Sequence, residues 1–319
     1  MRSYILRRVL LMIPTVFFVT VIIFISIRLI PGNIVDLMVS EYGTFGQVTQ
    51  VDKQAIEHEL GMDVTIPVQY ARWVDQIFHG NLGIAMWQHI PVMQEIESRW
   101  PVTLELTILA LIIAQILSIP IGIYSALRQN SWGDYLGRTF SILCIAVPTF
   151  WLATLVIVFP ALWWHYMPPL TLISFAANPL GNLKMFIVPS IVLGMGFSGM
   201  TTRLTRTMML EVMRQDYIRT AWAKGLRERT IVIRHSLKNA LIPIVTLIGG
   251  QLANLISGAV IIESIFGLPG LGLLTINAIS NRDYVTIEGV LLLYAVVLVL
   301  INLFTDLTYG FLDPRIHYN

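Results

Sequence analysis

The Lys and Arg residues of this chain, which could bind anionic groups, are most concentrated in residues 203–243. Nine Lys or Arg stand there against three acidic residues, Glu211, Asp216 and Glu228. In a chain that is otherwise apolar, so much positive charge indicates either a cytoplasmic loop at a membrane or a docking surface. Apolar residues also recur at helical spacing between Leu210 and Trp222, which predicts a short amphipathic helix. Contact with anionic lipid and docking of another protein explain this helix equally well.

The groups needed for phosphate binding, metal binding or redox chemistry are not arranged for these tasks. A phosphate-binding loop requires Gly-x-x-x-x-Gly-Lys-Ser/Thr, and no such run occurs. At Lys224 and Gly225 the order is reversed, and this glycine is better suited to ending a helix. The lone Cys144 lies in an apolar block and has no disulfide partner. None of the six histidines has the spacing of a metal site: His58, His79, His89, His165, His235 and His317. We therefore expect no catalytic residue, cofactor or metal on this chain.

The elements that must position the basic stretch are membrane spans. Of the 319 residues, 55% are hydrophobic and 13% are charged, whereas a soluble domain has roughly 25% charged residues. The first apolar block has about 19 residues after three arginines, which is too long for the core of a signal peptide. Six blocks are long enough to cross a bilayer, at residues 9–27, 106–127, 139–164, 186–202, 240–262 and 285–305. The sequence predicts an all-α integral membrane protein with six transmembrane helices.

The positive charges predict the side on which each loop lies. With the N-terminus in the cytoplasm, fifteen of the 21 Lys and Arg lie on the inner side, and the opposite orientation would place residues 203–243 outside. Both termini are therefore expected in the cytoplasm. The chain then divides into the N-terminus with span one (1–30), an external segment (31–100), a core with spans two to six that includes the basic loop (101–306), and a cytoplasmic tail (307–319).

Three further features each have two interpretations. The external segment, rich in acids and aromatics, either receives a partner or substrate from outside or covers the mouth of a pore. The turn after the fifth span needs a specific backbone because of its glycines and proline, and it either caps that span or contacts something external. The uncharged polar residues of the fifth span either line a pathway or pack against other helices; they are Gln251, Asn254 and Ser257.

Short motifs in a fixed order along the chain carry a family resemblance. They are Tyr4-Ile5-Leu6-Arg7-Arg8, Gly80-Asn81-Leu82-Gly83, Pro148-Thr149-Phe150-Trp151, Asp216 to Gly225 with His235, Asn239 and Pro243, the turn at 265–272 with Arg282-Asp283-Tyr284, and Leu312-Asp313-Pro314-Arg315-Ile316. With these motifs the chain resembles, from end to end, the permease subunits of the oligopeptide/dipeptide/nickel class of ABC importers. The stretch from Thr220 to Gly225 looks like the family's Glu-Ala-Ala loop, although Arg219 stands where the general pattern has Glu.

The resemblance implies a non-catalytic subunit in a bacterial or archaeal plasma membrane. Its partners would be a second, homologous permease that forms a heterodimer with it, two cytoplasmic ATPases that bind ATP and Mg, and an external solute-binding protein, with no nucleic acid. It implies alternating access for di- or oligopeptides, or for nickel, glutathione or an oligosaccharide. By similarity, an ATPase would contact the coupling residues Asp216, Arg219, Thr220, Ala221, Lys224, Gly225 and Leu226. The binding protein would face Phe266, Gly267, Pro269, Gly270 and Gly272.

Two other classes of protein remain as alternatives. An ion-coupled secondary transporter or a respiratory membrane subunit places ionisable residues inside its spans. Here the spans are nearly free of charge, and Arg28, Glu105, Glu263, Glu288 and Asp306 lie near span ends. A membrane-bound enzyme would need a catalytic group of residues, which the sequence does not offer. Uptake that depends on protons without any ATPase would favour the first alternative.

Overall fold

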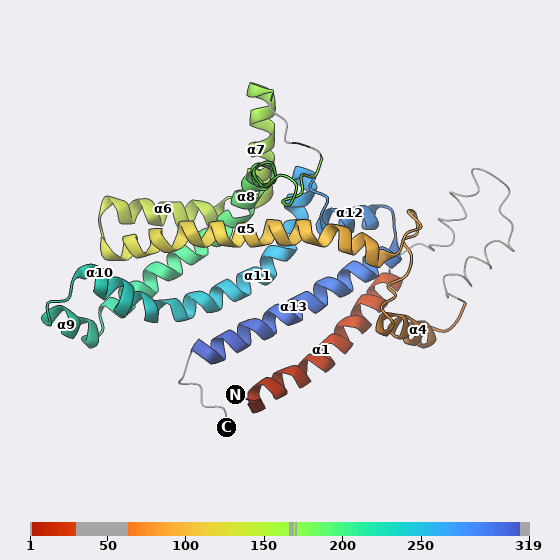
Figure 1. Cartoon of the computed structure of the whole chain (residues 1–319), viewed down its shortest axis with the longest axis horizontal. Coiled ribbons are helices and arrows are strands. Elements are labelled where there is room, and N and C mark those ends of the chain that lie inside the picture. The colour runs from red at the N-terminus through yellow and green to blue at the C-terminus, as the bar shows by residue number, and fades with distance from the viewer. Residues whose placement is uncertain (1, 30–62, 166–168, 170, 313–319) are drawn as a thin grey trace. The chain divides into compact units, whose positions relative to one another are not determined.

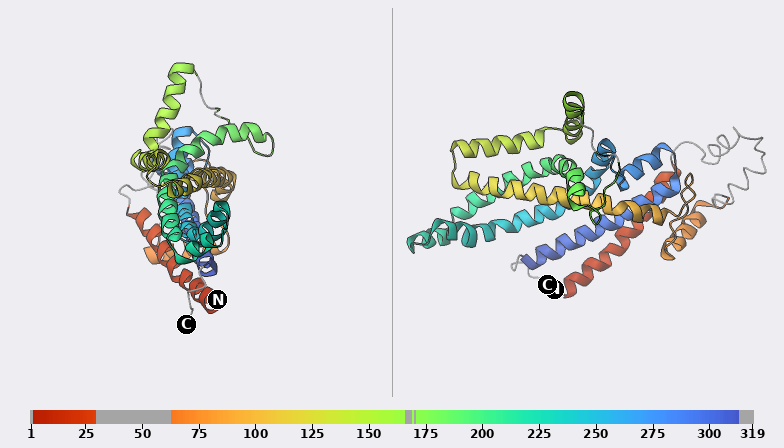
Figure 2. Two further views of the ribbon diagram at one scale, coloured as in Figure 1. Left: turned by 90° about the vertical axis from the view of Figure 1, so that its left-hand side faces the viewer. Right: turned by 45° about the horizontal axis from the view of Figure 1, so that its top comes forward.

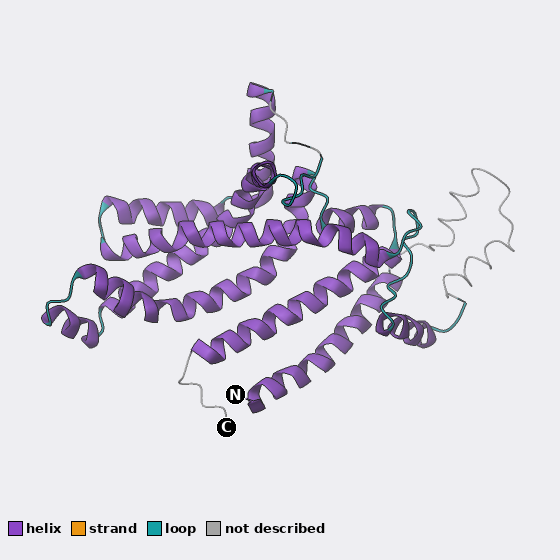
Figure 3. Ribbon diagram, viewed as in Figure 1, coloured by secondary structure: helices purple, strands orange, loops and turns teal. Residues whose placement is uncertain are grey.

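The structure, a computed structural model, describes residues 2–29, 63–165, 169 and 171–312. Within these ranges the regular elements are helices, apart from one isolated antiparallel bridge between Ile84 and Pro91 (Figure 3). This confirms the predicted all-α class. The helices are α1 (Arg2–Arg28), α4 (Ile66–Phe78), α5 (Val92–Leu127), α6 (Trp132–Ala146), α7 (Thr149–Trp164), α8 (Pro179–Met213), α9 (Asp216–Ala223), α10 (Glu228–Thr230), a π-helical turn (Ile231–Leu237), α11 (Lys238–Phe266), α12 (Leu271–Ser280) and α13 (Tyr284–Leu312).

The helices that are long and apolar enough to cross a membrane agree with the predicted spans. Within the described ranges there are five of them, and the bent pair α6 and α7 makes a sixth if it counts as one span. The five lie at Arg8–Arg28, Val92–Leu127, Pro179–Met213, Glu228–Phe266 and Tyr284–Thr308. Most begin earlier or end later than predicted, because polar residues continue these helices beyond their apolar blocks.

The third predicted span is not one helix. α6 and α7 meet at an angle of 94° across Val147 and Pro148. A proline disfavours helical conformation in the residue before it, and Val147 has an extended backbone with φ −81° and ψ 120°. The apolar block predicted as a span over 139–164 is therefore a bent pair of helices rather than one straight helix.

The fourth predicted span belongs to the long helix α8, although its glycines lowered its expected helix propensity. These glycines lie where other helices come close. A Cβ at Gly194 would lie 2.6 Å from the carbonyl oxygen of Ala110, and one at Gly199 would lie 2.6 Å from the carbonyl oxygen of Ser141. The glycines therefore let α8 pack tightly against α5 and α6, as small residues do between membrane helices.

The chain folds as two compact units. Of the described residues, the first unit comprises those within 2–9, 99–274 and 298–312, and the second comprises those within 10–29, 63–98 and 275–297. In the first unit α8 packs against both α6 and α11, and α8 and α11 run beside each other in Figure 2. Its core is built from buried residues of α5, α7, α8 and α11, among them Leu106, Ala153, Phe186, Leu193, Leu255 and Ile262.

In the second unit, the C-terminal part of α1 joins α4 and the start of α13. Arg28 makes an ion pair of 2.6 Å with Glu288, donates to Gln69 of α4 at 3.0 Å, and lies 3.3 Å above the ring of Phe24. Residues 30–62 and 313–319 lie outside the described residues, so the first half of the predicted external segment and most of the predicted tail are not described. The predicted segment boundaries stay a prediction.

Candidate functional site

The helix predicted from the apolar residues between Leu210 and Trp222 is divided in the structure: residues up to Met213 continue α8, and α9 begins at Asp216. The C-terminal end of α9 is built by Gly225. This glycine has a left-handed backbone with φ +73°, which a side chain would strain. Its N–H donates to the carbonyl of Trp222 at 2.9 Å, and the N–H of Leu226 donates to the carbonyl of Ala221 at 3.3 Å. This pair of bonds is the Schellman arrangement, which satisfies carbonyls at a helix end. The backbone therefore turns sharply after eight helical residues and leads into α10.

The inner face of α9 is fixed to its own chain. Ile218 has no exposed surface and Ala221 is 7% exposed, and both pack with Ile231 of the π-helical turn and with Met213 at the end of α8. The hydroxyl of Tyr217 accepts a hydrogen bond of 2.8 Å from Asn239 of α11. α9 is thus attached to α8 before it and to the π-helical turn and α11 after it.

The outer face of α9 is polar and exposed. Asp216 and Arg219 form an ion pair of 3.2 Å, and both side chains are almost fully exposed. Trp222 is 45% exposed and Leu226 is 37% exposed. Of the seven predicted coupling residues, six are exposed, and only Ala221 is buried within the chain. Ala221 therefore holds α9 in place, and the other six form an outer face that a partner can reach.

The turn between α11 and α12 is folded around a buried carboxyl group. Glu263 has no exposed surface, and its Oε1 accepts from the hydroxyl of Thr103 at 2.6 Å. Its Oε2 accepts from the backbone N–H groups of Gly272 and Leu273 at 2.7 and 3.2 Å, at the start of α12. These N–H groups have no partner within their own helix, so Glu263 caps α12 from the preceding helix α11.

This cap accounts for the glycines of the turn. Gly267 ends α11 with φ +65°, and a Cβ at Gly270 would overlap the carboxyl group of Glu263. Of the five residues predicted to face a binding protein, Phe266, Gly270 and Gly272 are buried, Pro269 is partly buried and Gly267 is exposed. The described geometry agrees with a capping turn, which was one of the two interpretations of this sequence.

The three candidate pathway residues of α11 have different environments. Gln251 is 3% exposed; its amide donates to Thr201 of α8 at 3.0 Å and its oxygen accepts from Gln115 of α5 at 3.2 Å. It therefore links three helices of the first unit. Asn254 and Ser257 are exposed, and their spacing places them on one face of α11 with Gly250.

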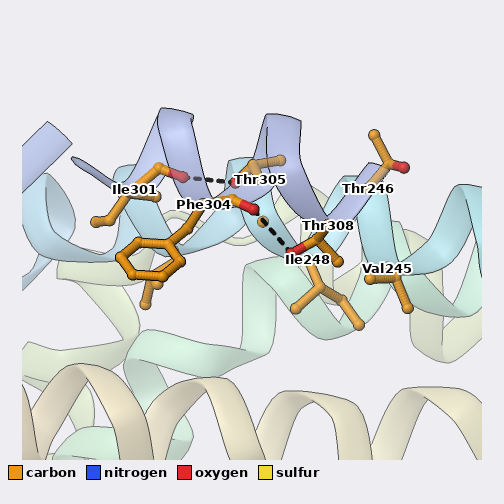
Figure 4. Close-up of a pocket in the computed structure, with 9 residues that line it drawn as sticks. Val245, Thr246, Ile248, Ile301, Phe304, Thr305 and Thr308 are labelled. Carbon is orange, nitrogen blue, oxygen red and sulfur yellow. Dashed lines mark hydrogen bonds between the residues drawn. The ribbon is translucent and has the colours of Figure 1, made fainter. Parts of the chain in front are cut away.

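A cavity of about 260 Å³ lies between α11 and α13 in the first unit (Figure 4). Its three threonines donate their hydroxyls to the carbonyls four residues earlier in their own helices, as Thr305 does to Ile301 at 2.8 Å. The cavity therefore presents mainly methyl groups and the ring of Phe304. Such a surface suits apolar contacts and offers no polar group to orient a polar substrate.

Two buried ion pairs were not predicted: Asp134 with Arg206 in the first unit, and Arg28 with Glu288 in the second. Their partners are far apart in the sequence, so no local pattern connects them. The start of α6 did carry a signal, because Ser131 and Asp134 have the spacing of a helix-capping sequence. Among the described residues there is no group of three or more His, Cys, Asp or Glu that could hold a metal ion.

Comparison with known proteins connects this geometry to transport. Residues 118–318 match the family "binding-protein-dependent transport system inner membrane component", and residues 1–107 match the N-terminal family of the same components. The dipeptide transport system permease protein DppB of Alkalihalophilus pseudofirmus is 38% identical over the whole of both chains. DppB of Escherichia coli K12 is 36% identical, over 100% of this chain and 99% of that protein. A putative peptide transport system permease protein of Brucella suis is also 36% identical over both full lengths.

Solved structures share the fold. A chain of the inward-facing MetNI methionine ABC transporter superposes with a TM-score of 0.55 at 17% identity, and the match covers 69% of this chain and 97% of that chain. A chain of an amino acid ABC transporter crystallised with histidines has a TM-score of 0.51 at 16% identity, covering 68% and 94% of the two chains. Both likenesses concern the fold alone.

Proposed function

This chain belongs to the family of binding-protein-dependent transport system inner membrane components, and from that premise we propose how it takes part in ATP-driven peptide import. It is a multi-pass plasma-membrane protein and the permease subunit of a peptide ABC importer, and it works with ATPase subunits. The observation that carries the peptide assignment is the 36–38% identity, over full length, to relatives named as dipeptide permeases.

The mechanism that we propose is alternating access driven from α9. ATP closes the two separate ATPase subunits, which move the outer face of α9, and this chain and a second, homologous permease then open their shared cavity outward. The support from this chain is the attachment of α9 on one side, through Ile218 and Ala221, and its polar exposed face on the other. A rigid attachment is required if a push on the outer face is to move the helices behind it.

The partners and orientation of the complex follow from the same assignment. We propose that the second permease is a different chain, that an external solute-binding protein delivers the peptide, and that both termini lie in the cytoplasm. The charge distribution supports this orientation, since it places the basic stretch around α9 on the side where ATP is available. The exposed Gly267 and the partly buried Pro269 are the residues of the α11–α12 turn that the binding protein could reach.

The substrate that we propose is a di- or oligopeptide. Its pathway would include Asn254 and Ser257, which are the exposed polar residues among the three candidates on α11. Exposed polar groups on a membrane helix are costly in lipid, so they favour a water-filled cavity or a protein contact. The role of Gln251 would be to hold α11 in place beside the pathway, since it bonds to both α5 and α8.

The test is reconstitution of the complete importer in proteoliposomes with the co-encoded permease, ATPases and binding protein. We expect uptake of a labelled dipeptide that requires ATP and the binding protein, and no uptake when the phosphate-binding lysine of the ATPases is replaced. Nickel, glutathione and an oligosaccharide serve as competing substrates, and uptake of one of these instead would replace the peptide assignment. Uptake driven by a proton gradient without ATP would refute the mechanism and favour an ion-coupled transporter.

A further inference from the structure

An ion pair joins the start of α6 to α8 in the first unit. Nε and Nη2 of Arg206 donate to Oδ1 and Oδ2 of Asp134 at 2.7 and 2.8 Å. The Asp134 side chain has no exposed surface, and that of Arg206 is 20% exposed. Two parallel hydrogen bonds between planar groups fix an angle as well as a distance. The pair therefore holds the start of α6 in one orientation on α8.

Each partner belongs to a different segment at the end of the first unit that carries α9. Asp134 also accepts from the backbone N–H of Asn130 at 3.0 Å, so it organises the turn between α5 and α6. Arg206 lies on α8 about two turns before Met213, which packs against the inner face of α9. Figure 1 shows the α5–α6 turn and α9 at the same end of this unit.

The helices around the pair are also in close contact at small residues away from it. A Cβ at Gly199 of α8 would lie 2.6 Å from the carbonyl oxygen of Ser141 in α6, and a Cβ at Gly122 of α5 would lie 2.9 Å from the carbonyl oxygen of Thr202 in α8. Small residues therefore already bring the three helices together. An Arg–carboxylate pair added to such a contact chiefly determines orientation, because guanidinium and carboxylate match in one plane.

We propose that Asp134 and Arg206 are positioning residues. They make the α5–α6 turn move together with α8 and α9 when the ATPases bind and hydrolyse ATP. The proposal rests on the proposed function, since it assumes that α9 receives the movement. In this proposal the two residues pass the movement of α8 on to α5 and α6. The ATPase contact itself stays with the outer face of α9.

The first test measures peptide molecules transported per ATP hydrolysed in the complete importer. We expect Arg206→Gln and Asp134→Asn to lower this ratio by about tenfold while the ATPases still co-purify, which is within the usual range of coupling between sites. Arg206→Lys, which keeps the charge but loses the paired donors, falls between these variants and the wild type. The control is Arg203→Gln, an exposed arginine one turn away, which keeps the wild-type ratio. An unchanged ratio in assembled Arg206→Gln complexes overturns the proposal.

The second test measures a distance within the protein instead of transport activity. Spin labels are placed on Gln129 in the α5–α6 turn and on Glu211 in α8, both exposed, after the buried Cys144 is replaced by Ala. We expect the wild-type distance distribution to stay the same with and without ATP, and to broaden in Arg206→Lys. A wild-type distance that shifts with ATP refutes the proposal. Absence of any ATP-driven uptake by the wild type would instead refute the proposed function, so the two failures are distinguishable.

Discussion

Replacing Glu263 by Ala removes the side-chain acceptor of the Gly272 and Leu273 N–H groups at the start of α12 and leaves three donors facing its place. Two of them, the Gly272 N–H and the Thr103 hydroxyl, are buried, and the Leu273 N–H is partly buried. Each buried donor left without an acceptor costs about 1–3 kcal/mol, so we expect Glu263→Ala to lower the free energy of unfolding by about 4 kcal/mol. Glu263→Gln keeps one oxygen acceptor, and we expect about half of that loss.

The assay uses the single cysteine of the chain. Cys144 is buried, so a thiol-reactive dye reports thermal unfolding of the purified protein in detergent as this residue becomes accessible. We expect the midpoint to fall in the order wild type, Glu263→Gln, Glu263→Ala, with Ser264→Ala, an exposed neighbour, equal to wild type. If Glu263→Ala melts with the wild type, the carboxyl group does not hold this turn and our account of its glycines is wrong.

Three further predictions concern other parts of the chain. Ala221→Glu places a carboxyl group under α9, so we expect the protein to insert normally but to lose peptide-stimulated ATPase activity in the assembled importer; retained stimulation would contradict the role of α9. Glu288→Gln leaves Arg28 without its ion-pair partner, and we expect a loss of about 3 kcal/mol in the same thermal assay. Gln251→Leu should lower thermal stability by breaking bonds to two helices, whereas Asn254→Leu should leave the midpoint unchanged and raise the KM for peptide uptake. The opposite pattern would exchange the packing and pathway roles of these two residues.

The local features of the fold could be predicted from the sequence. Apolar blocks longer than a bilayer's thickness predicted the spans, and helical periodicity next to Gly225 predicted α9 and its end. The break between α6 and α7 could not be predicted from Val147 before Pro148, because the same pair at Val188-Pro189 lies inside the continuous helix α8. It was missed because the apolar block continues through it, and apolar content does not record backbone direction.

The features that depend on tertiary contacts could not be predicted in this way. Glu263 looked like a residue at a span end, and only the return of α12 toward α11 places two N–H groups on its carboxyl. Arg206 was one of nine positive charges, and nothing in its own helix distinguishes it from the exposed Arg203. Its partner lies on another helix, and a single sequence contains no information on that pairing.

The placement of charge along α11 bears on how the proposed pathway could pass peptides of different charge. Between Lys238 and Glu263 this helix contains no charged residue, and Glu263 is engaged by its cap. The exposed polar residues between them are neutral: Asn239, Asn254 and Ser257. A pathway must bind a substrate weakly enough to release it, and a fixed charge would retain peptides of the opposite sign. A neutral pathway therefore requires that selection happen elsewhere, which is the task that we propose for the external binding protein.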